Sequence, residues 1–335
     1  IFSCGLLTGK TAPVSSRLHI NALSPLTGLI GSSNVGGHFG VRLKECGIQS
    51  IIVRGRADTP VYLFIDEEGP QIRPADHLWG LDTRRTQQKI RNELSDNRLQ
   101  VMTIGPAGEN GVRFACIITD IDHAAGRTGM GAVMGSKNLK AIVVKAHARR
   151  HNEAGSGERE AVRKYVGKIR SSAEYKDLTR FGGAGYVRWA HDLGILAVRN
   201  FRENQIATID KIDGRRLDKH KIRSKGCYRC PVQCKAELEF KNAEEKDVPK
   251  SSRPEFESLA NLGAKCGIDD MEALVRIDNL CSRLGLDIIS TANAVSFAMD
   301  LFERGILSKE DFNGVELTWG AAEAVEELLY QMAYG

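Results

Sequence analysis

The sequence predicts an α+β protein with a β-rich first half and a mostly helical second half. Up to about residue 148, short runs of β-branched and aromatic residues recur between Gly, Asp and Pro, a pattern typical of strands. Beyond that point, apolar residues recur three or four positions apart, which is typical of amphipathic helices. The polar stretch 147–160 has the composition of a linker, so we expect one domain at 1–148 and another at 149–335.

The first half is predicted to contain at least five strands and one helix. The strands are expected at Ser50–Gly55, Val61–Asp66, Gln100–Gly105, Phe114–Asp120 and Ala141–Lys145. The helix is expected from about Thr83 to Leu94, with Asp82 capping its start and the pair Asp96 and Asn97 marking its end.

Two helices dominate the expected second half. Asp269 or Asp270 caps the first, whose apolar positions run from Met271 to Leu284 and which Gly285 ends. Ser290 or Thr291 opens the second, and Gly305 ends it. The charged stretch Lys241–Arg253, which we read as a loop, precedes this helical core.

Composition excludes several classes of protein. The 335 residues include 47 basic and 42 acidic side chains, and this mild excess of +5 does not indicate a nucleic-acid partner. No apolar stretch approaches the roughly 18 residues that span a bilayer. Eight cysteines in so large a chain favour reduced thiols and a cytoplasmic location over a secreted disulfide framework. The chain starts at Ile1 without Met, so we expect it to be the interior of a longer protein.

The most specific local signal is the run C-x2-C-x3-C formed by Cys227, Cys230 and Cys234. Closely spaced thiolates bind soft metals, and both zinc and cubane iron–sulfur clusters normally take four ligands. A fourth ligand therefore lies either elsewhere in this chain or outside it. For zinc, the candidates within the chain are His220, Cys266 and Cys281.

Glycine is the second signal, since 34 glycines cluster at 31–40, 124–135 and 181–185. Glycine-rich segments let the backbone approach a bulky ligand and aim N–H groups at its anionic parts. None of the three clusters matches a P-loop or a dinucleotide-binding fingerprint, so a nucleotide fold is not supported.

The order of these motifs resembles one family along essentially the whole chain. The resemblance rests on Ser24–Gly28, Ser33–Gly40, the long glycine motif Ala124–Ile142, Asn200-Phe201, the three cysteines, Pro254–Glu257 and Gly285–Ser290. In this order they resemble the tungsten-containing aldehyde ferredoxin oxidoreductases. The long glycine motif is specific enough to make coincidence a poor explanation.

The resemblance implies a tungsten, or occasionally molybdenum, held by two pterins on a β-rich saddle domain, with a [4Fe–4S] cluster nearby. By motif position, the residues that would bind the pterins and their phosphates are Arg17, Asn34, Gly36, Gly37, His123, Ala124, Gly126, Arg127, Leu286 and Asp287. Asn34 and the carbonyl of Ala124 would also bind Mg, an ion that prefers oxygen ligands. Cys227, Cys230 and Cys234 would hold the cluster, whose fourth ligand is expected after Gly335.

Two positions depart from the family pattern. Ser282 stands where members commonly have the first Asp of Asp-x-x-Gly-Leu-Asp, and a hydroxyl makes weaker, neutral contacts with a pterin. His123 stands where Arg is frequent, which would soften a phosphate contact. Neutral drift explains the Ser282 change equally well.

Glu257 is the predicted catalytic residue, with Glu255 second. A carboxylate beside the metal can act as general base on a water, or orient that water for attack on an aldehyde carbon. The alternative is that Pro254-Glu255 only starts a helix, where acidic first-turn residues favour the helix dipole.

The resemblance implies oxidation of an aldehyde to a carboxylate, with electrons passing to ferredoxin or to a partner subunit. A benzoyl-CoA reductase-type tungsten enzyme is the first alternative, but we expect that group to carry Cys at about the position of Glu257. A non-catalytic zinc-binding module is the second. A homodimer stays an open expectation, although the Glu-x-x-His tetrad that some relatives use for a shared metal is missing from the sequence.

Overall fold

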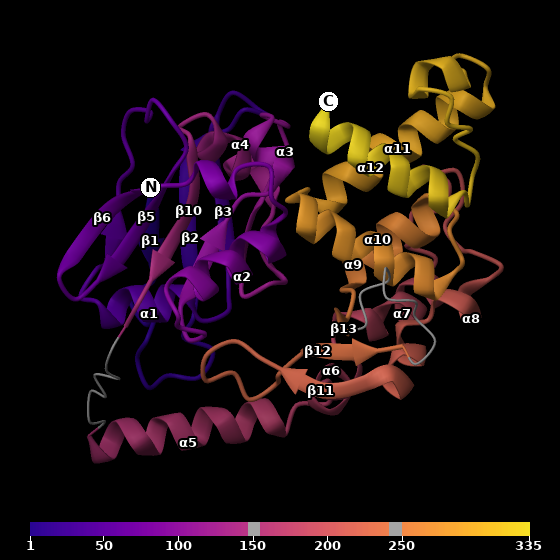
Figure 1. Ribbon diagram of the computed structural model, residues 1–335. Helices are drawn as coiled ribbons and strands as arrows, with labels where there is room; N and C mark the ends of the chain where they lie inside the picture. The colour runs from indigo at the N-terminus through magenta and orange to yellow at the C-terminus, as the bar shows by residue number, and fades with distance from the viewer. Residues whose placement is uncertain (147–154, 241–249) are drawn as a thin grey trace.

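A computed structural model describes residues 1–146, 155–240 and 250–335 of the chain. Its α+β character agrees with the prediction, since strands dominate the first half and helices dominate the second (Figure 1).

Two sheets build the first half. The antiparallel four-stranded sheet has the order β3-β2-β1-β4, with β1 at Phe2–Cys4, β2 at Leu18–Leu23, β3 at Ile30–Val35 and β4 at Ser50–Ile51. The six-stranded sheet has the order β6-β5-β10-β7-β8-β9, at Gly69–Pro74, Val61–Asp66, Leu139–Val144, Gln100–Thr103, Ile117–Thr119 and His123–Ala125. Only β5 and β10 run parallel in the described part of that sheet.

Strand β10 is buried along its whole length because it separates two apolar cores. Ile142 and Val144 face the core shared with the four-stranded sheet. Ala141 and Val143 face the second core. That second core is covered by α2, which supplies Ile90. Helices α1 (Phe39–Glu45), α2 (Thr83–Glu93), α3 (Pro106–Glu109) and α4 (Met130–Gly135) complete the first half.

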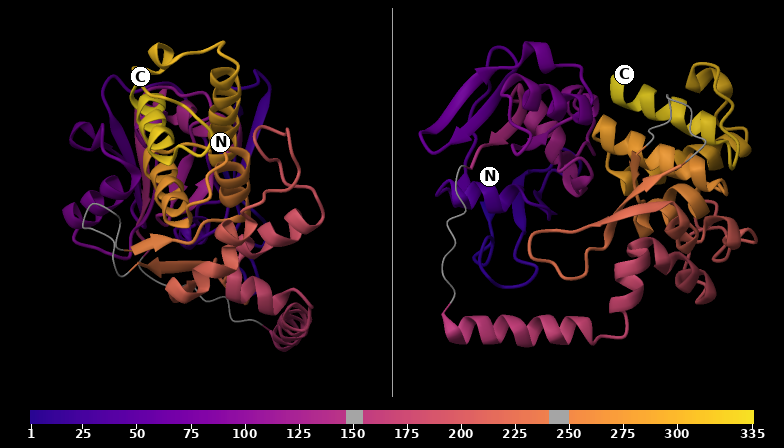
Figure 2. Two further views of the ribbon diagram at one scale, coloured as in Figure 1. Left: turned by 90° about the vertical axis from the view of Figure 1, so that its right-hand side faces the viewer. Right: turned by 60° about the horizontal axis from the view of Figure 1, so that its bottom comes forward.

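The second half contains the helices α5 (Ser156–Arg170), α6 (Tyr175–Phe181), α7 (Tyr186–Asp192), α8 (Ile209–Ile212), α9 (Phe256–Ser258), α10 (Met271–Leu284), α11 (Ile288–Glu303) and α12 (Ala322–Tyr334). Helices α7 to α12 pack around one core. A small antiparallel sheet lies beside them in the order β11-β12-β13, at Lys221–Lys225, Lys235–Glu239 and Lys250–Ser252. Helix α5 runs apart from the others along one side of the molecule and buries no residue (Figure 2).

Local capping signals predicted two helices well. Asp82 caps α2 by accepting a hydrogen bond from the Arg85 amide, as expected. Asp270 caps α10, and Gly285 ends it in the left-handed conformation at φ 77°. The predicted start of the next helix is wrong, because α11 begins at Ile288 with Asp287 as its cap. The Asp287 carboxylate accepts from the Ser290 amide, so the expected first residue lies inside the helix.

Two segments that the sequence predicted to be irregular contain regular secondary structure in part. Of the predicted linker, 147–154 lie outside the described residues, but Ser156–Glu160 belong to α5. Of the predicted loop Lys241–Arg253, 241–249 lie outside them, but Lys250–Ser252 pair with β12. Cross-strand pairing, which no local pattern indicates, makes that last segment a strand. Within the described ranges, no helix combines the length and apolarity needed to cross a bilayer.

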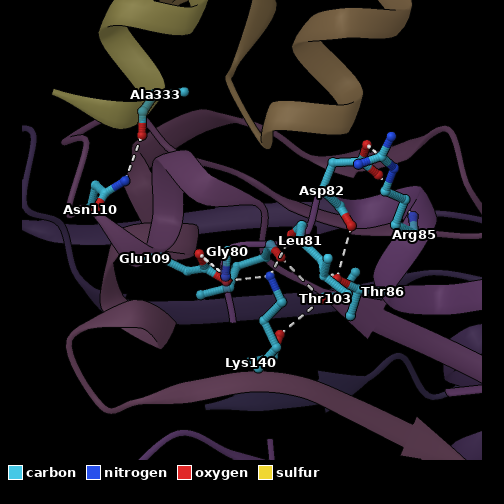
Figure 3. Close-up of polar contacts among 11 residues, drawn as sticks. Gly80, Leu81, Asp82, Arg85, Thr86, Thr103, Glu109, Asn110, Lys140 and Ala333 are labelled. Carbon is cyan, nitrogen blue, oxygen red and sulfur yellow. Dashed lines mark hydrogen bonds and ion pairs between the residues drawn. The ribbon is translucent and has the colours of Figure 1, made fainter. Parts of the chain in front are cut away.

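A polar bracket, formed by Asp82, Thr83, Glu109, Asn110, Lys140 and Arg283, lies where the two halves meet. Figure 3 shows four of these residues, Asp82, Glu109, Asn110 and Lys140. Lys140 is fully buried, and its Nζ donates to the Leu81 carbonyl at 2.8 Å and pairs with the Glu109 carboxylate. The second Glu109 oxygen accepts from the Gly80 amide at 2.8 Å. Both ends of this ion pair are therefore satisfied within the protein.

The bracket also joins the first half to helices of the second. Asp82 accepts hydrogen bonds from Arg283 at 3.1 and 2.9 Å, and Thr83 donates to the Ser282 carbonyl at 2.9 Å. Asn110 donates to the Ala333 carbonyl in α12 at 2.8 Å (Figure 3). The last turn of α10 is thus tied to the first half.

Candidate functional site

A cavity of about 440 Å³ lies between the two halves. Most of the predicted site residues line it: Arg17, Asn34, Gly36, His123, Ala124, Cys227, Cys234, Glu255, Glu257, Leu286 and Asp287. Gly37, Gly126, Arg127 and Cys230 are not part of this lining. Residues far apart in sequence therefore converge on one space, with walls from β3, β9 and α9 to α11.

The first wall comes from β3 and β9, which lie in contact. Asn34 on β3 accepts a hydrogen bond from Arg17 Nη1 at 2.9 Å, and its Nδ2 lies 2.8 Å from His19 Nε2. Ala124 is the central residue of β9 and is exposed to the cavity. The two residues predicted to share Mg thus come from neighbouring strands of different sheets.

Gly36 and Gly37 lie where other residues come close to the backbone. A Cβ on Gly36 would lie 2.7 Å from Cys227 Sγ. Gly37 has φ +84°, and a Cβ there would lie 2.1 Å from Asp120 Oδ2. The absence of a side chain at Gly36 thus lets Cys227 come against the first half, and Gly37 leaves room for Asp120.

The cysteine loop, which we define as 226–234, crosses from the second half to the first (Figure 1). The Tyr228 amide donates to the Gly37 carbonyl at 3.3 Å, and the Val14 amide donates to the Arg229 carbonyl at 3.2 Å. Cys227 and Cys234 face the cavity, whereas Arg229 is exposed to solvent. The loop therefore forms a wall between the cavity and the outside.

A short polar chain leads from Asp122 through His123 to Cys227. His123 Nε2 lies 3.7 Å from Cys227 Sγ. Burial would raise the pKa of the Cys227 thiol, but the neighbouring imidazole outweighs it and lowers that pKa to about 7. Burial would lower the pKa of His123, but Asp122 and Cys227 outweigh it and raise that pKa to about 9. The site thus favours a thiolate at Cys227, which is the form that binds metals.

Asp122 and His123 form a buried ion pair. Asp122 Oδ1 and His123 Nδ1 lie 3.0 Å apart, although they are not aligned for a hydrogen bond. The other Asp122 oxygen accepts from Ser252 at 2.6 Å. The pair fixes the imidazole so that its Nε2 atom faces Cys227.

Lys235 follows the last cysteine and was not predicted. Its Nζ donates to the Asp122 carbonyl at 3.1 Å and lies 3.3 Å from Glu255 Oε1. Burial would lower the pKa of this ammonium, but Asp122 and Glu255 outweigh it and raise it. Lys235 therefore remains charged and holds the Glu255 carboxylate beside the cysteine loop.

The second wall carries the two predicted catalytic carboxylates. Glu255 is the N-cap residue of α9, so the prediction of a helix start at Pro254-Glu255 is confirmed. Glu257 lies in the first turn with an exposed carboxylate, which accepts from Asn261 Nδ2 at 2.8 Å. The helix start and the cavity lining are compatible, because both carboxylates also face the cavity.

Asp278 is a cavity residue that sequence reasoning missed. It is buried in α10 and accepts from Ser258 Oγ at 2.5 Å. Burial raises the pKa of this carboxyl to about 6, although the Ser258 bond opposes the shift. Its sequence signal was an acidic residue next to Ile277 on the buried face of a helix, where a carboxylate is rarely found.

Asp287 is already engaged within the chain. Its carboxylate accepts from Ser290 Oγ at 2.5 Å and lies 3.4 Å from Arg127 Nη1. A Cβ on Gly126 would lie 3.2 Å from the same carboxylate. Ser282, the departure from the family pattern, lines the cavity. Arg127 and Gly126 thus contact Asp287, which lines the cavity, but do not line the cavity themselves.

The described residues contain no group of three or more His, Cys, Asp or Glu side chains placed to hold a metal ion. The structure also argues against the residues that we considered as a fourth ligand for zinc. Cys266 and Cys281 are buried in the helical core, where burial raises both thiol pKa values. His220 stacks on Phe240 with ring centroids 4.2 Å apart. The three loop cysteines are not placed as such a group either, so their sequence spacing alone indicates iron–sulfur ligation.

Comparison with known proteins agrees with these observations. Residues 1–146 match the model of the aldehyde ferredoxin oxidoreductase N-terminal domain, and residues 160–335 match the model of its domains 2 and 3. The tungsten-containing aldehyde ferredoxin oxidoreductase of Pyrococcus furiosus is 36% identical over 336 residues, which cover 99% of this chain and 55% of that protein. The protein of the same name from Pyrococcus horikoshii is 38% identical, covering 94% and 51%.

Relatives with other names share the same scaffold. The aliphatic sulfonate oxidoreductase, WOR-like subunit, of Pyrococcus furiosus is 35% identical, covering 97% of this chain and 54% of its own. The solved active-site complex BamBC of benzoyl coenzyme A reductase with 1,5-dienoyl-CoA has a TM-score of 0.82 and 29% identity, covering 99% of this chain and 51% of that one.

The fold and its relatives define the class as an oxidoreductase scaffold. The chain belongs to the aldehyde ferredoxin oxidoreductase family. It spans about half the length of the curated relatives it matches.

Proposed function

We propose that this chain forms the pterin-binding domain, 1–148, and the first helical domain, 149–335, of an aldehyde:ferredoxin-type oxidoreductase. The observation that carries the proposal is one cavity, which gathers most of the predicted residues of both halves beside the cysteine loop. We also propose the cytoplasm as its location, because all eight cysteines are free, as expected where thiols stay reduced.

The residues around the cavity fit the cofactors of such an enzyme. Cys227, Cys230 and Cys234 would hold a [4Fe–4S] cluster, and the lowered pKa of Cys227 supports that role. Oxygens of Asn34 and Ala124 would bind Mg. The carboxylate of Asp287, which lines the same cavity, could accept hydrogen bonds from the N–H groups of a pterin.

The proposed reaction converts R-CHO and water into R-COO⁻, three protons and two electrons. When bound, the tungsten- or molybdenum-pterin centre and the cluster supply the acceptor for those electrons and their route to ferredoxin. The carboxylate of Glu257 takes a proton from the water that attacks the aldehyde carbon. Asn261 orients that carboxylate through its hydrogen bond to Oε2. Lys235 fixes Glu255 beside it.

The test is metal and pterin analysis of the full-length protein expressed anaerobically, together with aldehyde-dependent viologen reduction. We expect Glu257→Gln to lower turnover by at least about 100-fold with unchanged tungsten and iron contents, because a general base contributes that much. Glu310→Gln, at an exposed position in 309–312, is the matched control and should keep full activity. One zinc without tungsten, molybdenum or iron would overturn the proposal. Unchanged turnover would remove Glu257 from the mechanism.

A benzoyl-CoA reductase-type activity is the second candidate, favoured by the TM-score of 0.82 to that complex. Glu257 argues against it, since we expect a cysteine there in that group. Reduction of an aromatic acyl-CoA by the same preparation, without aldehyde oxidation, would reverse this ranking.

A further inference from the structure

The positive charge of the chain is concentrated beside the cysteines. Residues 215–229 contain seven Lys or Arg side chains and one acidic residue, Asp218. The whole chain has 47 basic and 42 acidic residues, so the remainder holds slightly more acidic than basic ones. We name Arg215, Arg216, Lys219, Lys221, Arg223, Lys225 and Arg229 the basic face.

The basic face is accessible. Arg215, Arg216, Lys219, Arg223 and Arg229 are exposed. In sequence, the residues of the basic face lie in the 3₁₀ turn Gly214–His220, in strand β11 and in the cysteine loop. Strand β11 is an edge strand of the small sheet as the structure describes it, with β12 as its neighbour on one side, and it lies in the lower part of the molecule in Figure 1. A partner protein can therefore reach this face without displacing an element that the structure describes.

Nearby acids neutralise only part of this charge. Glu237 pairs with Arg223 and lies 3.7 Å from Lys225, and Asp213 pairs with Arg215 at 2.6 Å. Asp218 pairs with Arg180, which is one more cation beside the face. Cations still outnumber carboxylates, so the face attracts an acidic surface.

The basic face adjoins the cysteine loop in sequence and ends on it with Arg229. Cys227 and Cys234 line the cavity. Between them in sequence, the exposed Arg229 lies over the Tyr228 ring at 5.4 Å and donates to the Thr11 carbonyl. A carrier docked on the basic face would therefore lie against the outer side of the segment that holds the electron-transfer ligands.

We propose that the basic face is the docking surface for a small acidic electron-carrier protein of the ferredoxin class. This inference rests on the proposed function, because it assumes that electrons leave through the cysteine loop. Charge complementarity of this kind raises association rates by about 10- to 1,000-fold and weakens as salt rises. A nucleic acid would also bind a cationic surface, but nucleic-acid binding does not require that surface to adjoin the three cysteines.

The experiment compares two electron acceptors for the full-length holoenzyme. In the double variant Lys219→Glu/Arg223→Gln, ferredoxin reduction at low ionic strength should fall by about 10-fold or more, and its salt dependence should flatten. Viologen reduction should stay unchanged, because neither residue lines the cavity and a small dye needs no docking face. The matched control Lys309→Glu/Arg304→Gln makes the same charge change at exposed positions 304 and 309 and should leave both rates unchanged.

Each failure has a distinct signature. Absence of aldehyde-dependent viologen reduction in the wild-type enzyme would overturn the proposed function. Equal ferredoxin rates in the double variant and the wild type would overturn the docking surface alone. Binding of an acidic ferredoxin at low salt, measured by surface plasmon resonance, tests the face without turnover. Unchanged ferredoxin binding with lost binding of a duplex DNA probe would assign the face to nucleic acid instead.

Discussion

The polar bracket and the cavity wall both bury charge between the two halves, but they treat it differently. In the bracket, Lys140 Nζ and both Glu109 oxygens have partners inside the protein. In the cavity wall, Asp122 pairs with His123 and Lys235 pairs with Glu255, but the carboxylates of Glu255 and Glu257 also face the cavity. A closed network stabilises the fold by itself, whereas carboxylates that face a cavity can still accept hydrogen bonds from a ligand. The difference separates the closed part of the junction from the part that is proposed to bind a ligand.

The largest expected effect breaks the closed network. Lys140→Met leaves Glu109 buried without its cation, which we expect to cost about 3–5 kcal/mol of unfolding free energy. Guanidinium unfolding measures the loss. Arg98→Met is the control, because its pair with Asp96 is on the surface, with the Arg side chain 84% exposed, and its removal should change stability little. Equal costs for the two variants would mean that the bracket stabilises no more than a surface pair.

The next effect tests a buried carboxyl of the cavity wall, that of Asp278, through its pH dependence. The pKa of Asp278 is raised to about 6 in the folded chain, against about 3.9 when unfolded. Its protonated form therefore stabilises the fold fully below about pH 4, and this contribution is lost as the pH rises through about 6. Asp278→Asn removes the dependence and keeps an acceptor for Ser258.

Relative to wild type, the Asp278→Asn variant should therefore gain about 2–3 kcal/mol of unfolding free energy between about pH 4 and 7, at 1.4 kcal/mol per pKa unit. Unfolding curves at several pH values measure it. Asp269→Asn, where the side chain is 35% exposed and pairs with Lys211, is the control. A difference between Asp278→Asn and wild type that stays constant with pH would contradict the burial argument.

The smallest effect concerns packing beside the bracket. A Cβ on Gly105 would lie 2.3 Å from the Leu284 carbonyl oxygen, so Gly105→Ala forces the end of α10 away from the first half. We expect a loss of about 1–3 kcal/mol in unfolding free energy. Gly167→Ala, in α5 with nothing near its Cβ, should instead stabilise by up to about 1 kcal/mol. Similar changes in unfolding free energy for the two alanine variants would show that the junction accommodates the added methyl group without cost.

Sequence patterns predicted those features, such as helix ends, that are determined by interactions within a few residues. Asp82, Asp270 and Gly285 were recognised as helix ends because each acts on its own backbone within a few residues. The strand Lys250–Ser252 was missed because it exists only through pairing with β12. Nothing near Lys140 indicates that it is buried, since its partner Glu109 lies 31 residues away.

The same limit applies to the site. Motifs identified the three cysteines, Asn34 and Glu257 as candidates, and the structure brings most of the predicted residues to one cavity. Asp122, Lys235 and Asp278 were missed, because their importance comes from contacts across both halves. No spacing rule connects such residues in the sequence.

The cysteine loop has a consequence for how the protein matures. By sequence it belongs to the helical half, yet Tyr228 and Arg229 hydrogen-bond to Gly37 and Val14 of the first half. A cofactor that binds the cysteines in this docked geometry also favours the association of the halves. In the proposed enzyme, cofactor insertion and domain closure therefore form one coupled equilibrium, and removal of the cofactor is expected to weaken the contact between the halves.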